Sequence, residues 1–413
     1  MWIVQEIGTN APATLFWGDA EFDWEELSEV TEVLNKQYHY LRSRFTIYTP
    51  SLRYLYRRFV EPEEEYSQFH HRGNFIYELQ RARHLRSKDP RDHVYAFLGH
   101  FSINTGSKDL AHIQPDYSRS IVDVFVDVAV RELHGASTLI ILSACQSVIP
   151  IDTGRFIPED KTPKLPSWVP DWRLLPMHIL SSPETPHRAA GETKPKLRID
   201  EAQRILHIDG LRIDAISTKT VALYRDIFQF KRGKSGKTFL KTLWNDLLGF
   251  KNFGLSQRYR NGDSAFFALV QTLTNGCVIN DRTQLYQDFP PSQWLANGAA
   301  YLVRTQETKS SDEIDPSLVK LAGEGDAFKW SHEATLVSRH RKFAVTANGY
   351  YVTGPVEMGE GDIVTVLYGG RTPYVLRRIE EGWRILGDCH VHGIMNGEAL
   401  ESGEYAEETF SIY

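Results

Sequence analysis

Cysteine is scarce in this sequence. Its 413 residues include three cysteines, Cys145, Cys277 and Cys389, which lie far apart. Such a set cannot build the disulfide framework that stabilises small secreted domains. The N-terminus has neither the basic region nor the apolar run of a secretory signal, and no apolar run reaches the roughly 18 to 20 residues of a membrane span. We therefore expect a cytoplasmic protein without a membrane span.

An excess of charge of one sign is also missing. The sequence has 47 lysines and arginines against 53 aspartates and glutamates, and its net charge is −6. Proteins that bind nucleic acid concentrate positive charge to displace counterions from the phosphate backbone. The mild, dispersed negative charge predicts no nucleic-acid partner. Because 41% of the residues are hydrophobic, the chain can form a sizeable core.

Established catalytic motifs are absent as well. The sequence contains no Gly-x-Ser-x-Gly elbow and no His-Glu-x-x-His pair. Residues 233–238, Gly-Lys-Ser-Gly-Lys-Thr, end like a phosphate-binding loop, but too few residues separate Gly233 from Gly236 for the backbone to wrap a phosphate. We interpret this segment as a basic, solvated loop before a helix. The residues therefore predict no catalytic group, no cofactor-binding residue and no cofactor.

Two clusters of polar residues have side chains that could bind a metal or act in acid/base chemistry. Alternation along an extended segment would place Asp388, His390 and His392 on one face, where they could bind a metal. No second cluster supplies the missing ligands at metal-site spacing, so we expect hydrogen-bonded side chains and no metal site. A metal-assisted enzyme that uses these three residues is the alternative. Asp89, Arg91 and Asp92 beside Pro90 could serve in acid/base chemistry, but caps and ion pairs are favoured.

Apolar periodicity divides the chain into a helical and a β-rich part. Helices are predicted over 22–45, with Asp23 as N-cap, over 75–86, and over 118–133, with Ser118 or Ser120 as cap. Period-two alternation predicts a hairpin over 196–217. Five further strands are predicted at 342–345, 350–353, 362–367, 374–379 and 383–389, and three helices before them at 238–248, 265–273 and 292–303. Residues 312–329 are polar and stay unassigned.

These elements indicate an α+β fold, in which an N-terminal helical region precedes a small C-terminal β-barrel or sandwich-like sheet with a helical insertion. Open strand edges are unfavourable, so the hairpin should join the five strands in one closed sheet. We expect a helical region at 21–135, an irregular connector rich in Pro and Trp at 136–195, and a β-rich domain at 196–413 with its insertion at about 236–330. In the connector, Trp168 and Trp172 flank Pro170 and should fill a core.

Several motifs together resemble the fungal heterokaryon incompatibility (HET) domain family. They are residues 89–99, Asp-Pro-Arg-Asp-His-Val-Tyr-Ala-Phe-Leu-Gly, residues 115–118, Pro-Asp-Tyr-Ser, residues 165–172, Leu-Pro-Ser-Trp-Val-Pro-Asp-Trp, and C-terminal segments around 361–362 and 392–393. The matching positions include Asp89, Pro90, Arg91, Asp92, Tyr95, Gly99, Pro115, Asp116, Tyr117, Ser118, Trp168, Pro170, Asp171, Trp172, Gly361, Asp362, His392 and Gly393.

The resemblance also implies a function and a boundary. Residues 2–7 resemble the closing motif of the HET domain, so residues 1–20 are expected to be its end, with most of that domain outside this sequence. Apolar side chains near residues 2–7 should then be exposed or covered by a partner. The family implies fungal non-self recognition and regulated cell death through protein contacts, without enzymatic activity of this chain alone. An accessory protein of a fungal biosynthetic gene cluster is a further alternative.

Overall fold

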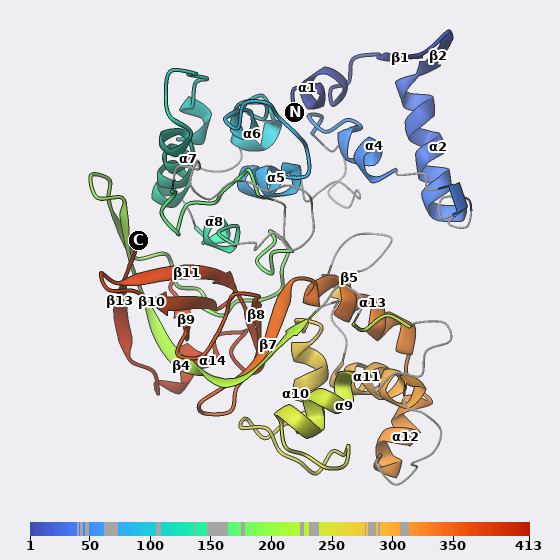
Figure 1. The fold of residues 1–413 in the computed structure, drawn as a ribbon, viewed down its shortest axis with the longest axis vertical. Coiled ribbons are helices and arrows are strands. Elements are labelled where there is room, and N and C mark those ends of the chain that lie inside the picture. Colours follow the sequence, from blue (N-terminus) through green and yellow to red (C-terminus); the bar gives the residue numbers. More distant parts are fainter. Residues whose placement is uncertain are drawn as a thin grey trace. The chain divides into compact units, whose positions relative to one another are not determined.

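The computed structural model forms two compact units (Figure 1). Unit 1 comprises Met1–Gly135 and Trp172–Pro176, and unit 2 comprises Ala136–Asp171 and Met177–Tyr413. The described residues are 1–38, 41, 44–45, 49–61, 73–104, 109–135, 137–146, 164–174, 178–223, 227–230, 239–276, 278–279, 286–287, 290–305 and 314–413. The glycine- and lysine-rich segment 233–238 lies outside them.

Unit 1 is mainly helical. Its described elements are α1 (Ile3–Ile7), β1 (Thr14–Trp17), β2 (Ala20–Asp23), α2 (Trp24–Gln37), α4 (Pro50–Leu55), α5 (Phe75–Ala82), α6 (Asp92–Tyr95), η2 (Phe101–Asn104), η3 (Leu110–His112) and α7 (Ile121–Gly135). Asp23 caps α2 by accepting a hydrogen bond from the Glu25 amide at 2.7 Å, as predicted. Ser120 caps α7, because its Oγ accepts from the Asp123 amide at 3.1 Å.

The core of unit 1 includes residues of α5 and α7. Phe75 and Leu79 of α5 are buried, as are Phe125 and Val128 of α7. Trp172 is fully buried with the Arg83 guanidinium 4.8 Å from its ring centre. The β1–β2 hairpin, which the periodicity did not predict, lies at the surface with almost every residue exposed.

Unit 2 is built on a nine-stranded sheet that contains a closed ring. The strands are β3 (Leu197–Asp200), β4 (Ile205–Leu223), β7 (Arg341–Thr346), β8 (Tyr351–Pro355), β9 (Ile363–Leu367), β10 (Tyr374–Arg378), β11 (Trp383–Asp388), β12 (His390–Val391) and β13 (Glu407–Ile412). Strand β4 pairs with β9, then β10, β11 and β13 follow in order, and β13 pairs again with β4. The predicted hairpin therefore joins the later strands in one sheet, but only β9, β10 and β11 of the five predicted strands belong to the closed ring. Strands β7 and β8 extend the sheet outside the ring, and β13, which was not predicted, closes it.

Strand β4 is long enough to pair with strands in two parts of the sheet. Its residues 206–211 pair with β13 and residues 210–215 with β9, whereas its distal end pairs with β7. Register shifts interrupt both the β9 and the β7 pairing, and such bulges bend a strand. Figure 1 shows β4 in green, running from the red strands of the ring to orange β7.

A helical insertion lies between β4 and β7. Its described elements are α9 (Phe239–Lys241), the π-helical turn Thr242–Leu247, α10 (Ala265–Thr272), β5 (Val278–Ile279), β6 (Tyr286–Gln287), α11 (Pro291–Thr305), α12 (Pro316–Ala322) and α13 (Ala327–Ser338). Helix α12 and the first residues of α13 lie in the stretch 312–329 that the sequence left unassigned. The remaining helices of unit 2 are α8 (Ile140–Ser143) and α14 (Glu398–Ser402). One apolar core includes residues of both the barrel and the insertion. No helix among the described residues is long and apolar enough to cross a membrane.

Candidate functional site

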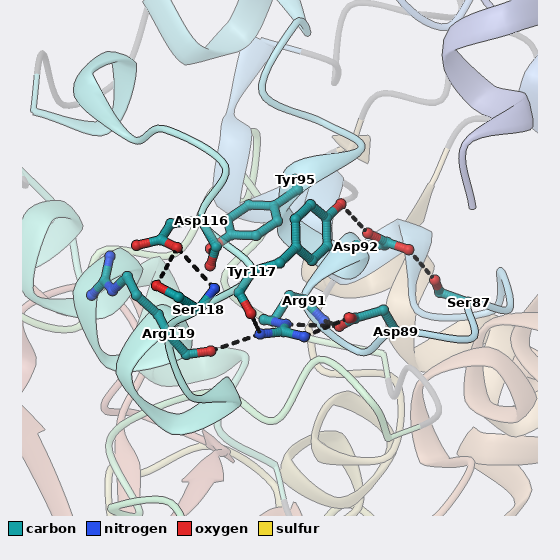
Figure 2. Close-up of polar contacts among 9 residues, drawn as sticks. All are labelled: Ser87, Asp89, Arg91, Asp92, Tyr95, Asp116, Tyr117, Ser118 and Arg119. Carbon is teal, nitrogen blue, oxygen red and sulfur yellow. Dashed lines mark hydrogen bonds and ion pairs between the residues drawn. The ribbon is translucent and has the colours of Figure 1, made fainter.

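The family motifs of unit 1 meet in one polar cluster, drawn in Figure 2. Pro90 lies between Asp89 and Arg91, and the Asp89 carboxylate accepts hydrogen bonds from the Arg91 backbone amide at 3.0 Å and from its Nε at 2.9 Å. The Arg91 Nη2 forms an ion pair with Asp89 at 2.6 Å. Arg91 Nη1 donates to the carbonyl oxygens of Tyr117 and Arg119, the latter at 2.8 Å. One arginine therefore joins the turn before α6 to the loop before α7.

Asp92 makes a second connection between the same two segments. One of its carboxylate oxygens accepts from the Tyr117 hydroxyl and the other from Ser87 Oγ, both at 2.7 Å (Figure 2). The pKa of Tyr117 is raised to about 12. Partial burial is the larger cause, and the hydrogen bond to Asp92 is the second. The phenol thus stays protonated at neutral pH and serves as a donor.

A third set of contacts fixes the Pro-Asp-Tyr-Ser turn itself. The Tyr95 hydroxyl donates to the Asp116 carbonyl oxygen at 3.0 Å, and the rings of Tyr95 and Tyr117 pack edge to face with their centres 5.3 Å apart. The Asp116 carboxylate accepts from the Ser118 amide at 2.8 Å and from its Oγ at 2.6 Å. The Ser118 hydroxyl is the main cause of the lowered pKa of Asp116. Such an Asx turn stabilises the entry to a helix.

The cluster has the chemistry of a structural interlock. Every carboxylate in it accepts hydrogen bonds from its own chain, and the hydrogen bond from the Arg91 side chain is the main reason that the pKa of Asp89 lies below its ordinary value. A general acid needs the opposite, a carboxyl pKa raised toward neutrality. The contacts are the ion pair and turn hydrogen bonds that the sequence favoured. Gly99 lies in the turn after α6, and Pro115 directly precedes Asp116.

The two motif tryptophans belong to different units. Trp168 is fully buried in unit 2, where its Nε1 donates to the Arg204 carbonyl oxygen at 2.9 Å. Trp172, also fully buried, belongs to unit 1 together with Arg83. Both rings fill a core, as predicted. Pro170 and Asp171 connect them along the chain.

In the barrel, the motif pair Gly361 and Asp362 forms the turn before β9. Gly361 has a φ of +81°, which glycine adopts without strain. The Asp362 carboxylate accepts two hydrogen bonds from the Arg377 guanidinium, both at 2.8 Å, and one from the Gly359 amide at 2.8 Å. This bidentate pair fixes the turn to β10.

The three metal-ligand candidates have separate partners. Asp388 is fully buried and accepts hydrogen bonds from Arg341 Nη2 at 2.7 Å, from Gln146 Nε2 at 2.9 Å and from the Leu180 amide at 2.6 Å. His392 Nε2 lies 2.8 Å from Asp263 Oδ2, and Gly393 follows in a turn with a φ of +79°.

His390 packs against another histidine instead of joining Asp388 or His392. Its ring centre lies 5.8 Å from that of His187, and burial lowers the pKa of His390. Strand β11 ends at Asp388 and β12 begins at His390, so the alternation assumed from the sequence is broken at Cys389. Within the described part of the chain, no three His, Cys, Asp or Glu side chains are grouped to hold a metal ion.

The sequence did not reveal Arg341 as the partner of Asp388. The Arg341 side chain is buried, and its two amino groups also donate to the carbonyl oxygens of Asp388 and His178, at 2.9 and 2.7 Å. Together with Gln146 and Leu180, this arginine ties the connector to the ends of β7 and β11. No local pattern links residues so far apart, and Arg341 is the first residue of β7, next to Lys342.

Comparisons with known proteins agree with the motifs. Residues 309–412 match the family model of the Het-6 beta-barrel domain. The chain is also 24% identical over 405 residues to heterokaryon incompatibility protein 6, OR allele, of Neurospora crassa, in a match that covers 81% of this chain and 54% of that protein. The chain thus spans about half the length of this curated relative. No solved structure matches. The barrel match and this relative agree with the resemblance of the motifs to the fungal heterokaryon incompatibility family.

Proposed function

We propose that this chain acts in non-self recognition between fungal cells and in the regulated cell death that follows, through protein contacts in the cytoplasm. The observation that carries the proposal is the likeness to heterokaryon incompatibility protein 6 over 81% of the chain. That likeness spans only about half of the relative. It therefore supports a role in non-self recognition and cell death without assigning the chain to one step of them.

Protein contact is favoured over catalysis by how the motif residues are used. The carboxylates of the Asp89–Ser118 cluster and Asp388 of the barrel all accept hydrogen bonds from their own chain. Unit 1 at the same time exposes large apolar side chains, among them Trp2 at 40% and Ile3 at 48%, in the segment where the sequence predicted exposure. Exposed apolar groups of this size are typical of surfaces that contact other proteins.

The proposal is tested in living cells. The chain is expressed at matched levels in Neurospora crassa strains that do or do not carry the OR allele of heterokaryon incompatibility protein 6, and viability is measured by dye exclusion. We expect loss of viability that depends on the strain. Equal viability in both strains, and in heterokaryons formed between them, would contradict the proposal. A Trp168→Ala variant, in which the barrel core is damaged, is the inactive control.

A further inference from the structure

The β1–β2 hairpin and the outer side of α2 form an exposed apolar surface, here called the hairpin surface. Its apolar members and their exposed fractions are Trp17 (77%), Phe22 (44%), Val30 (54%) and Val33 (43%). Its acidic members are Asp19, Glu26 and Glu29, all exposed. The surface has no role in the motif cluster or in the barrel.

The hairpin leaves large side chains without a cover. Leu15 pairs with Phe22, and Trp17 pairs with Ala20 two residues along, so Leu15, Phe22 and Trp17 share one face of the ribbon. Phe16, opposite Glu21, lies on the other face. The described residues add no third strand to this sheet. Two strands alone are marginally stable in water, so a further element against the hairpin would stabilise it.

Helix α2 continues the apolar character beside the hairpin. Glu26, Val30 and Val33 recur at a spacing of four and three residues, which places them on one stripe. Val30 and Val33 are about half exposed, whereas Thr31, on the opposite side, is 2% exposed. The helix therefore has an inner face that packs on unit 1 and an outer apolar stripe that does not.

The charge along this segment of the sequence has one sign. Between Asp19 and Glu32 the sequence has seven acidic residues and no basic residue. Asp23 caps α2, and Glu25 accepts a hydrogen bond from the Tyr56 hydroxyl. Asp19, Glu21, Glu26 and Glu29 form no ion pair with any residue that the structure describes. A second copy of the chain would bring this negative charge against itself, and like charges at an interface cost binding energy.

We propose that the hairpin surface binds a basic amphipathic helix of a partner protein. The apolar face of such a helix would cover Trp17, Phe22 and Val30, and its flanking lysines or arginines would pair with the acidic side chains. Helices with these properties bind apolar surfaces through anchors spaced three and four residues apart. The inference rests on the proposed function in that it names the class of partner through which the chain would act.

Binding is measured with a fluorescently labelled synthetic helix of leucine and lysine, titrated with the full-length chain and followed by anisotropy. We expect saturable binding that weakens as salt is added. Trp17→Ser combined with Phe22→Ser should weaken it by about tenfold or more, and Glu26→Lys with Glu29→Lys should do the same. Since all four side chains are exposed, the melting temperature should not change.

Matched controls and contradicting outcomes complete the design. Phe328→Ser and Glu324→Lys change an equally exposed aromatic and acid in unit 2 and should leave the affinity unchanged. The inference is overturned if the wild-type chain does not bind, if the hairpin variants bind normally, or if a leucine–glutamate helix binds as well. It is also overturned if sedimentation reveals a dimer that Trp17→Ser dissociates. Failure of binding with strain-dependent cell death intact would remove this inference alone.

Discussion

The barrel and the β1–β2 hairpin differ in how many neighbours each strand pairs with and in how far their side chains are buried. In the barrel ring each strand has two neighbours, and all five residues of β9 are buried. In the hairpin each strand has one neighbour, and all four residues of β2 are exposed. A closed sheet removes the edges that attract other chains, whereas an open ribbon keeps them. We infer that the barrel is built for stability and the hairpin for contact.

The largest effect should come from the buried ion pair that supports the barrel. Arg341→Met leaves Asp388 charged and buried, which typically costs about 4 kcal/mol, and the free energy of unfolding in urea should fall by that order. Arg377→Met is the matched control, because the Arg377 side chain is 37% exposed and its loss should cost less. Equal losses for the two variants would contradict the central position given to Arg341.

The next prediction compares a buried tryptophan of unit 2 with an exposed tryptophan of the hairpin. Trp168→Ala opens a cavity at a fully buried position and should reduce the free energy of unfolding by about 3 kcal/mol. Trp17→Ala, at a side chain that is 77% exposed, should leave the melting temperature nearly unchanged. A large loss for Trp17 would show that the hairpin is part of a core, and the comparison would fail.

A smaller effect should appear in the core of unit 1. Burial raises the pKa of Glu132 on α7 from its ordinary 4.5 to about 7. The folded chain then holds this proton more tightly than the unfolded chain, so stability falls as the pH rises between these values. Glu132→Gln should therefore stabilise the protein by about 2 kcal/mol near pH 8. The gain should vanish below about pH 4.5, and a gain that is independent of pH would contradict the burial of an ionisable group.

The smallest effect is expected in the motif cluster. Asp92→Asn keeps the shape of the side chain but weakens two charge-assisted hydrogen bonds, from Tyr117 and Ser87, which should cost about 1 kcal/mol. Chemical denaturation measures the difference, and Tyr117→Phe should give a loss of similar size. A loss above that of Trp168→Ala would mean that the cluster, and not the tryptophan, holds the fold.

Local patterns predicted the elements whose signals are contained in one segment. The cap at Asp23, the helix that became α7 and the alternation of β3 and β4 were all visible in short windows. Strand β13 was missed because its partner is distant: Phe410 pairs with Ile208, and two glutamates at the start of the strand hide its alternation. Helices α12 and α13 had usable signals, since Asp315 and Asp326 cap them, but their polar surroundings concealed the periodicity.

The candidate site was predictable as a set of motifs but not as a geometry. Asp89, Arg91 and Asp92 are neighbours in sequence, so an ion pair among them could be expected. Their bonds to the segment around Tyr117 depend on how the turn and the loop before α7 fold back on each other. The exposure of Trp17 could not be foreseen either, because aromatic residues next to a Gly-Asp turn are usually read as core. Only the fold shows that nothing else in the described chain packs there.

The inference that the hairpin surface serves contact with a partner can be tested in one measurement. The wild-type chain and the Trp17→Ser, Phe22→Ser double variant are expressed at equal levels in fungal cells, and cell viability is counted. We predict that the wild-type chain reduces viability and that the double variant, equally folded, does not. An equal reduction of viability by both chains would contradict the claim.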